Sequence, residues 1–395
     1  MTKAILVLNA GSSSIKFALY QMGELALLAR GQITEFVKHL SSQSLFEVSQ
    51  PDQSALKIQL DTIHNHQQAT AFIINWISQD SHPWELIAAG HRVVHGGPIR
   101  DKPAIVDADV FAELKMLEPL APQHQPHNLN AIQAISENFP KIQQVACFDT
   151  AFHANQGAVN RLLPLPEFLR NKGLMNYGFH GLSYEYLVGQ VTDRMGGVVP
   201  EKMVIAHLGN GASACAVKNG VSEATTMGFS TLDGLVMGSR CGSIDPGVLL
   251  HLLKTEGMDS DELSHILYEQ SGLLGLSGLS SDIRDLVNSN SEQAKIALKV
   301  YIISLVKHIT SLASVLEGLD TLVFTGGVGE NSAYIRESVI KKLSWLGCEI
   351  DHNANNRGQS CITRKQSKIK VLVLPTNEEL IIARQTMQLC QDCSI

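Results

Sequence analysis

Two short segments of this chain, 200 positions apart, share one pattern, and that repetition most constrains what the chain can fold into. Each contains an apolar strand, a turn of Gly, Ser, Ala and Asn, and a second apolar strand; the segments are Ile5–Tyr20 and Ile205–Lys218. Leu8, Gly11 and Ser13 align with Leu208, Gly211 and Ser213. A tight turn of small residues leaves backbone N–H groups uncovered, so an anion can approach closely. Two such turns, one in each half, predict a duplicated fold that closes around a polyphosphate.

The composition is that of a protein with a large buried interior. The 395 residues suffice for two domains with full cores, and 44% apolar against 17% charged residues excludes a disordered chain. The net charge of −7 argues against nucleic acid or an anionic membrane as a main partner. No apolar run approaches about 18 residues, so no membrane span is expected. The apolar run after Met1–Lys3 is shorter than the roughly 7–15 residues of a signal-peptide core.

The seven cysteines are odd in number and scattered, which favours reduced thiols in a cytoplasm. Cys390 and Cys393 form an isolated C-x-x-C, which we interpret as exposed thiols of a polar tail. Cys147, Cys215 and Cys241 lie in small or apolar surroundings and are interpreted as small core residues. No spacing of Cys and His resembles a zinc site.

Alternating strands and helices predict an α/β protein with two similar halves. The first half is expected to contain a hairpin over 4–20, strands over Leu25–Ile33, Leu86–Gly90 and Val145–Phe148, helices over Gln68–Ser78, Val110–Leu117 and Asn128–Glu137, surface loop and edge strand over Thr34–Ser54, and a proline-broken loop over Glu118–Pro126.

The second half repeats the logic. It is expected to contain strands over Met203–Leu208, Ser213–Val217, Leu322–Phe324 and Val371–Leu374, a long helix over Ala294–Leu316, a glycine turn closing Phe324–Asn331, and a helix from about Ser332. We expect domains over 1–150 and 151–378, with a C-terminal helix (about 379–395) packing back on the first domain. A ligand is expected in the cleft between the domains.

The first candidate for phosphate binding is the turn Gly11-Ser12-Ser13-Ser14 with Lys16. Hydroxyls of Ser12 and Ser14 and the turn amides could cradle phosphate oxygens while Lys16 supplies a point charge. An ordinary hairpin turn explains the same residues, and the Walker A spacing is absent. Gly209-Asn210-Gly211 is open to both interpretations too, because Asn-Gly is a common turn dipeptide.

Four charged or titratable side chains stand at strand ends or between glycines. Arg92 follows a buried strand and precedes two glycines, which suits bidentate binding of a carboxylate or phosphate, or a structural salt bridge. Asp149 ends a buried strand; metal binding, positioning of a nucleophile and capping of the next turn all remain open. Arg240 and His180 each lie between glycines, and His180 fits ligand contact and structural hydrogen bonding equally well.

Together these residues are more specific than any one of them. Glycine turns, two arginines, a histidine, an acid and Glu378 beside Asn377 suit phosphoryl transfer, which needs positioning and neutralisation of oxygens, with Mg²⁺ bridging phosphates, more than covalent chemistry. The helix expected from Ser332 adds an N-terminus that favours a phosphate.

Nearly from end to end, the chain resembles the acetate kinases, members of the acetate and sugar kinase/Hsp70/actin superfamily. The matching segments are Asn9–Lys16, His91–Gly97, Phe148–His153, Tyr177–Gly181, His207–Ser213, Met227–Phe229, Gly238–Gly242, Gly272–Gly278, Phe324–Ser332 and Pro375–Leu380. The resemblance implies two duplicated actin-like (ribonuclease H-like) domains with an interdomain nucleotide cleft.

The resemblance also implies reversible, ATP-dependent phosphorylation of acetate or another short carboxylate to an acyl phosphate and ADP, by direct in-line transfer, commonly in a homodimer. Mg²⁺, for which Mn²⁺ can substitute, is implied at Asn9 and Glu378. Arg92 and Arg240 are implied to grip the carboxylate and the phosphoryl group in flight, with His180 stabilising the latter. Implied ATP contacts are Lys16, His207, Leu208, Gly209, Asn210, Gly211, Asp282, Ile283, Arg284, Gly327, Val328, Gly329, Glu330 and Asn331.

Elementary acid–base chemistry narrows the role of Asp149. A short carboxylic acid has a pKa near that of a Glu side chain, about 4.3, and is therefore ionised at neutral pH. The nucleophile needs no general base, so we expect Asp149 to organise Mg²⁺ or to orient the attacking group. The harder task is to bring an anionic carboxylate to an anionic phosphate, and Arg92, Arg240, His180 and Mg²⁺ neutralise that charge.

The chain departs from the family at the pocket for the acyl methyl group. The resemblance implies Val94, Gln123, Phe179 and Thr231 there, where the family has Leu for Gln123 and Pro for Thr231. This is either drift at tolerated positions or altered acyl specificity. A buried amide or hydroxyl costs affinity unless it is hydrogen-bonded, and a hydroxy- or keto-acid could offer Gln123 a partner that acetate lacks. Further departures are Asn176, Tyr184 and Ser243, where the family has Arg, His and Asp.

Three functions remain to be distinguished. The first is an acetate kinase, and the second is a kinase for propionate or another small acid, separated from the first only by pocket shape. The third is a non-catalytic protein that uses ATP as a conformational switch. The retained Arg92 and Arg240 argue against the switch, because a switch has no need of two carboxylate-gripping arginines.

Overall fold

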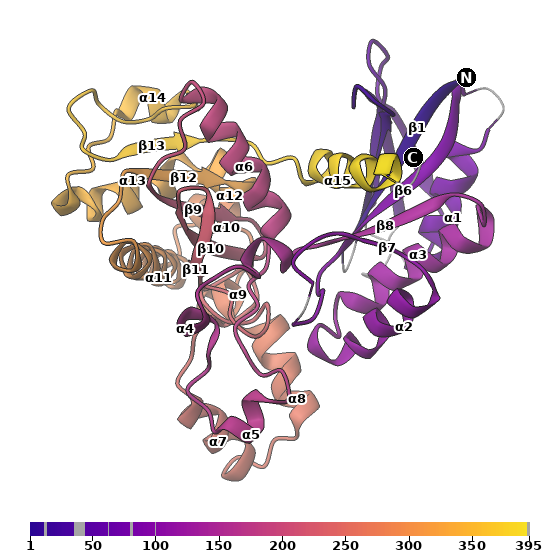
Figure 1. The fold of residues 1–395 in the computed structure, drawn as a ribbon. Coiled ribbons are helices and arrows are strands. Elements are labelled where there is room, and N and C mark those ends of the chain that lie inside the picture. The colour runs from indigo at the N-terminus through magenta and orange to yellow at the C-terminus, as the bar shows by residue number, and fades with distance from the viewer. Residues whose placement is uncertain (12–13, 35–43, 62, 80–81, 99, 393–395) are drawn as a thin grey trace. The chain divides into compact units, whose positions relative to one another are not determined.

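The chain divides into two compact units (Figure 1). The computed structural model describes residues 1–395 except 12–13, 35–43, 62, 80–81, 99 and 393–395. One unit consists of Met1–Ala154 with Asn377–Ile395, and the other of Asn155–Thr376. The final segment of the chain thus belongs to the unit that contains its beginning.

An eight-stranded sheet forms the first unit, in the order β5-β4-β3-β2-β1-β6-β8-β7. Its strands are β1 (Thr2–Ala10), β2 (Ser14–Gln21), β3 (Leu27–Thr34), β4 (Ser44–Ser49), β5 (Leu56–Leu60), β6 (Trp84–Val93), β7 (Ala104–Ile105) and β8 (Gln143–Phe148). Its helices are α1 (His66–Ile77), α2 (Ala108–Met116), α3 (Gln125–Asn138) and α15 (Glu378–Asp392), with short 3-10 turns η1 (Glu118–Leu120) and η2 (Ala151–His153).

Both faces of β1 are covered, which explains why every residue from Ala4 to Ala10 is buried. Leu6 and Leu8 pack in an apolar cluster with residues of α1 and α3. On the same sheet, α15 packs along β1, β6 and β8 (Figure 1). Because side chains alternate along a strand, Asn9 points away from the Leu8 cluster and hydrogen-bonds Glu378 at the start of α15.

A five-stranded sheet forms the second unit, in the order β11-β10-β9-β12-β13. Its strands are β9 (Lys202–Leu208), β10 (Ala212–Lys218), β11 (Val221–Thr225), β12 (Thr321–Thr325) and β13 (Lys370–Val373). Its helices are α4 (Ala158–Arg161), α5 (Glu167–Arg170), α6 (Gly181–Arg194), α7 (Pro246–Lys254), α8 (Ser260–His265), α9 (Gly272–Ser277), α10 (Ile283–Asn288), α11 (Glu292–Val315), α12 (Gly326–Asn331), α13 (Ala333–Lys342) and α14 (His352–Asn356), with a short π-helix η3 (Ile266–Gln270) and a 3-10 turn η4 (Ser344–Leu346).

Helix α11 packs along β9, β10 and β11 and against α9. Within the described part of the chain it is the one helix whose length and composition would let it cross a membrane. Its buried residues, among them Ile302, Leu305 and Ile309, lie within this packed unit. The core helix of a folded domain passes the same length and composition test.

The two sheets share a five-strand order, β3-β2-β1-β6-β8 and β11-β10-β9-β12-β13. In each, three antiparallel strands are extended by two parallel ones. The expected α/β duplication is confirmed.

The spacing of 200 residues does not relate equivalent positions of the two hairpins. Ala10 pairs with Ile15 at the first turn, whereas Leu208 pairs with Ala212 at the second. Turn length sets the register of a hairpin, and these turns differ by one residue. Leu208 therefore takes the place of Ala10 rather than that of Leu8.

Two expected segments differ in the structure. Part of the loop expected over Glu118–Pro126 is helical, because α3 begins at Gln125 with Pro126 in its first turn, where a missing N–H costs nothing. The edge strand expected within Thr34–Ser54 is an inner strand, since β4 lies between β3 and β5 and Phe46 is fully buried.

Three of the six described cysteines are buried, namely Cys147, Cys215 and Cys348. Cys147 and Cys215 are buried, as expected, and Cys241 is half-buried. Cys390 is half-buried rather than exposed, and Cys393 lies outside the described residues.

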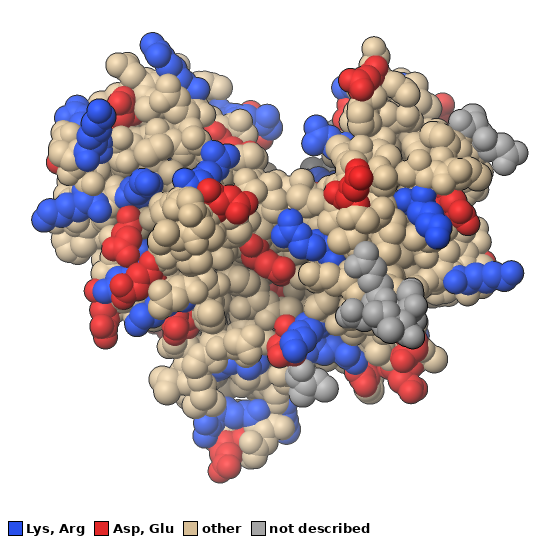
Figure 2. Space-filling model, turned by 45° about the horizontal axis from the view of Figure 1, so that its top comes forward, with Lys and Arg blue, Asp and Glu red and all other residues tan. Residues whose placement is uncertain are grey.

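The face in Figure 2 carries Lys and Arg side chains interspersed with Asp and Glu.

Gly90→Ala tests the packing of α15 against β6. A Cβ at Gly90 would collide with Thr386 Oγ1 and lie 2.7 Å from Ile382 Cγ2. We expect a loss of about 1–3 kcal/mol of stability and faster proteolysis of the C-terminal helix. Thermal unfolding and limited proteolysis measure this. Gly189→Ala on α6, where a Cβ meets nothing within 4 Å, is the control; equal melting of Gly90→Ala and wild type would contradict the packing.

Candidate active site

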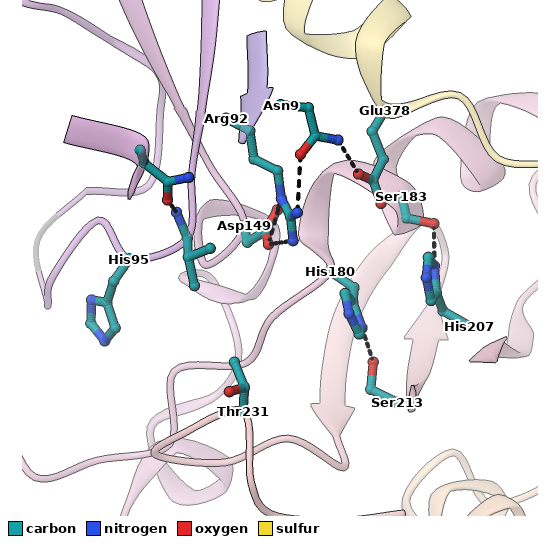
Figure 3. A network of polar contacts seen from close by, with 12 residues as sticks. Asn9, Arg92, His95, Asp149, His180, Ser183, His207, Ser213, Thr231 and Glu378 are labelled. Carbon is teal, nitrogen blue, oxygen red and sulfur yellow. Dashed lines mark hydrogen bonds and ion pairs between the residues drawn. The ribbon is translucent and has the colours of Figure 1, made fainter. Parts of the chain in front are cut away.

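Arg92 and Asp149 form a buried ion pair in the first unit (Figure 3). They stand at or just beyond the ends of the neighbouring parallel strands β6 and β8. Arg92 Nη2 lies 2.6 Å from Asp149 Oδ2, and Nε donates to both carboxylate oxygens at 3.1 and 3.2 Å. The Asp149 side chain is 1% exposed and that of Arg92 16%. The structure thus shows Arg92 in the salt bridge that was one interpretation of its position, with Asp149 as its partner.

Asn9 links this pair to α15. Arg92 Nη1 donates to Asn9 Oδ1 at 3.1 Å, and Asn9 Nδ2 donates to Glu378 Oε2 at 3.2 Å. Burial by itself lowers the pKa of the Arg92 guanidinium, but the charges of Asp149, Glu378 and Glu379 outweigh it and raise that pKa. Arg92 is therefore a permanent cation beside the two residues expected to hold a metal.

The first glycine turn lies on the same sheet. Lys16 is opposite Asn9 across β1 and β2, so both side chains share a face, and that of Lys16 is exposed. Ser14 accepts at its carbonyl from the Gly11 amide at 2.8 Å. Ser12 lies outside the described residues. His66, which the sequence did not point to, has Nε2 2.6 Å from the Gly11 carbonyl and therefore donates to the turn.

The first-unit part of the expected acyl pocket is held by two buried amides. Asn128 Oδ1 accepts from the Val94 amide at 3.0 Å, and Gln125 bonds both the N–H and the carbonyl of His95 at 3.1 Å. Burial lowers the pKa of His95 to about 4, so it is neutral. Gln123 is half-buried in the preceding turn and makes no hydrogen bond within the described part of the chain.

In the second unit, two histidine rings stack with their centroids 4.3 Å apart. His180 precedes α6 in a left-handed conformation (φ 60°), and His207 lies near the end of β9. His180 Nδ1 lies 2.8 Å from Ser213 Oγ, and His207 Nδ1 lies 2.9 Å from Ser183 Oγ (Figure 3). The structure thus brings together two residues that the sequence placed in different motifs.

Arg240 joins this group at the second glycine turn. A Cβ built on Gly211 would lie 3.5 Å from Arg240 Nη1 and 3.7 Å from His180 Nε2. Arg240 Nη1 donates to the Thr231 carbonyl at 3.1 Å. Phe179 is buried next to His180. The Arg240 guanidinium and the His180 imidazole therefore converge at Gly211, where the turn carries no side chain, which is a geometry suited to an anion.

The other residues expected at ATP lie around the same turn. The Gly238 amide approaches the Asn210 carbonyl at 3.4 Å, and a Cβ at Gly238 would lie 3.1 Å from the Ser281 carbonyl. Ser281 precedes Asp282, which caps α10 by accepting from the Arg284 amide at 2.8 Å. Ile283 is buried, and the Arg284 side chain is exposed and paired with Asp282. A Cβ at Gly326 would lie 2.7 Å from the Leu208 carbonyl, so the start of α12 also packs on this turn.

The segment Gly327–Asn331 is helical, which corrects the expectation of a glycine turn, whereas the helix expected from about Ser332 is confirmed as α13. Helix α12 begins directly after β12, and Ser332 caps α13. Glu330 Oε1 accepts from the Gly326 amide at 2.9 Å and so satisfies an amide at the helix start. Glycine content predicted a turn, but this reach-back contact stabilises a helix.

Arg336 fixes the end of α12, and sequence reasoning missed it. Its side chain is 1% exposed and donates to the carbonyls of Gly329 and Glu330, both at 2.8 Å. Asn355 accepts from the same guanidinium at Oδ1, 2.8 Å away. In the sequence, Arg336 looks like an ordinary exposed arginine of a helix, so no sequence signal marked it as buried or as a partner of α12.

The departures from the family pattern have structural partners. Ser243 Oγ donates to Asp233 Oδ1 at 2.8 Å, and Asn176 Nδ2 donates to the Asn160 carbonyl at 3.0 Å. The Tyr184 hydroxyl lies 2.5 Å from Ser213 Oγ. These polar groups are thus accommodated locally.

Comparison with known proteins assigns the class and then the family. One crystal structure with this fold is an acetate kinase of Porphyromonas gingivalis, with a TM-score of 0.86 and 35% identity over 98% of this chain and 100% of that one. Another is a propionate kinase of Francisella tularensis, with a TM-score of 0.90 and 35% identity over 98% of this chain and 99% of that one. The two-domain actin-like fold is thereby confirmed.

Relatives by sequence include the acetate kinase of Rickettsia prowazekii, which is 43% identical over 98% of this chain and 100% of its own length. The acetate kinase of Rhodopseudomonas palustris strain TIE-1 is 44% identical over 98% of this chain and 99% of its own length. A family model described as the Acetokinase family matches residues 4–384. The chain belongs to the acetokinase family.

Arg240→Ala tests the anion-binding geometry of the second unit. Removing the Arg240 guanidinium from beside Gly211 is expected to lower kcat at least about 100-fold, with the melting temperature nearly unchanged. Steady-state kinetics and thermal unfolding measure both. The exposed Arg364→Ala is the matched control and should retain wild-type turnover. Near-normal turnover of Arg240→Ala would exclude a role in the reaction.

Proposed function

We propose that this protein transfers the γ-phosphoryl group of ATP directly and reversibly to acetate, giving acetyl phosphate and ADP. The observation that carries the proposal is chain-long identity of 43% and 44% with acetate kinases. The Arg92 group and the His180–Arg240 group support it, because both present cations or donors suited to anionic substrates.

The proposed chemistry needs no proton transfer. An oxygen of ionised acetate bonds to the γ-phosphorus while the bond from that phosphorus to the β–γ bridging oxygen breaks, and ADP leaves with the electron pair. In our proposal Arg92 binds the carboxylate, and Arg240 and His180 bind the phosphoryl oxygens. Asp149 holds the Arg92 guanidinium in orientation through its bidentate contact.

We assign Asn9 and Glu378 as the protein's ligands for Mg²⁺, for which Mn²⁺ would substitute. An amide oxygen and a carboxylate are donor types that suit this cation, which is held by one or two carboxylates plus substrate phosphates. In this structure Asn9 directs Nδ2 to Glu378 and Oδ1 to Arg92, so the amide would have to turn for its oxygen to bind the ion. Among the residues that the structure describes, no group of three or more His, Cys, Asp or Glu forms a complete metal cage. When bound, the ion supplies positive charge to the phosphates.

We propose that the protein is a homodimer, by analogy with the family, and that it is cytoplasmic, because its cysteines are odd in number and scattered. Light scattering should give about twice the chain mass of 43.0 kDa. A monomeric mass would contradict the dimer and leave the proposed reaction intact.

Trapping of acyl phosphate as a hydroxamate tests the reaction itself. With Mg-ATP and acetate, hydroxylamine should capture a product that is absent when either substrate is omitted. ATP binding without any captured product would favour the non-catalytic switch instead.

A second candidate function, a kinase for another small acid, rests on the polar positions Gln123 and Thr231. A half-buried amide that makes no hydrogen bond to another described residue disfavours an apolar methyl group nearby. We expect Gln123→Leu to raise kcat/KM for acetate about 5- to 10-fold, with no gain for glycolate.

Comparison of kcat/KM for acetate, propionate, glycolate and pyruvate in wild type, Gln123→Leu and Thr231→Pro measures the effect. The exposed Gln359→Leu is the control. A strong preference of the wild type for acetate, with kcat/KM unchanged by Gln123→Leu, would contradict an altered acyl specificity.

A further inference from the structure

Two consecutive residues in the first turn of α6 hold the two stacked histidines. Ser183 Oγ contacts His207 Nδ1, and also Thr376 Oγ1 at 2.8 Å. Tyr184 acts on the other ring through an intermediate, since its hydroxyl contacts Ser213 Oγ, which contacts His180 Nδ1. Each imidazole is thus fixed at Nδ1 by a hydroxyl.

The two hydroxyls that lead from Tyr184 to His180 are buried. Tyr184 and Ser213 are both fully buried. The Tyr184 amide donates to the His180 carbonyl at 3.1 Å, so one helical turn separates the two side chains. A buried hydroxyl without a partner is unfavourable, so burial itself favours the observed contacts.

The other nitrogen of His180 faces the proposed phosphoryl site. With Nδ1 turned to Ser213, Nε2 points toward Gly211, near the place that Arg240 Nη1 also approaches. An imidazole nitrogen that contacts a phosphoryl oxygen has to carry a proton, because an unprotonated nitrogen presents a lone pair to a lone pair. The contact at Nδ1 decides which nitrogen is protonated.

We propose that Tyr184 is a positioning residue that sets the tautomer of His180. The phenol, the more acidic hydroxyl, donates to Ser213 Oγ; Ser213 donates to His180 Nδ1; and Nε2 keeps the proton that it donates to the phosphoryl oxygen. The opposite direction of the same chain would protonate Nδ1 and leave Nε2 as an acceptor. This inference rests on the proposed role of His180.

The test compares Tyr184→Phe, Ser213→Ala and the double variant. We expect each to lower kcat about 10-fold or more while KM for ATP and acetate changes less than about 2-fold, because only the phosphoryl contact is weakened. The double variant should lose no more than Ser213→Ala alone, since both act along one path. Tyr186→Phe, on the same helix and half-buried, is the matched control and should behave as wild type.

A second readout does not depend on turnover. Nitrogen-15 NMR of His180, assigned by the signal lost in His180→Gln, should show the Nε2–H tautomer in wild type and a mixture in Tyr184→Phe. Wild-type kcat and an unchanged His180 spectrum in Tyr184→Phe, or losses that multiply in the double variant, would overturn the inference. If Tyr184→Phe fails to fold, Ser213→Ala decides by the same spectrum. Absence of acyl phosphate from wild type would refute the proposed function, and the spectrum would still decide the tautomer.

Discussion

The buried contact between Arg92 and Asp149 is the interaction on which the polar surface of the first unit depends. One guanidinium bonds the residue after β8 and the side chain of Asn9 near the end of β1, and Asn9 in turn bonds the first residue of α15. Removing one partner from such a buried pair costs about 3–5 kcal/mol, because the other charge remains desolvated. The positions of these strand ends and of α15 are therefore tied to a single charged contact.

The second unit builds a polar group on the same strand order by different means. Neutral hydroxyls of Ser183, Ser213 and Tyr184 orient two histidines, and Arg240 is held by a carbonyl oxygen. The duplicated sheet is thus a scaffold, and each unit carries chemistry of its own. In the first unit an ion pair between Arg92 and Asp149 holds the site residues in place. In the second unit, neutral hydroxyl contacts hold the histidines, and we propose that they set the tautomer of His180.

Local pattern was enough to predict the hairpins, the buried parallel strands and most long helices. It also marked Arg92, Asp149, His180 and Arg240, because each lies at a strand end or between glycines. Pattern failed where a distant or reach-back contact decides the outcome. The family resemblance, and not local pattern, placed Asn9 and Glu378 together across 369 positions. The contact of Glu330 with the Gly326 amide lies in the glycine-rich segment that forms helix α12 and not a turn.

The residues that sequence reasoning missed act through backbone groups or through other side chains. Arg336 and Gln125 bond carbonyls and amides, which leave no trace in residue type or spacing. Tyr184 was noticed as a departure from the family, but its contact with Ser213 required the packing of α6 near β10. Tertiary contacts of this kind are visible only once the chain is folded.

The stereochemical course at phosphorus tests the central claim most directly. The claim is a single in-line transfer between two anions whose charge the protein offsets, with no phosphorylated side chain in between. ATP made chiral at the γ-phosphorus with three oxygen isotopes should give acetyl phosphate of inverted configuration. Retention of configuration would mean two successive transfers and would contradict direct attack by acetate.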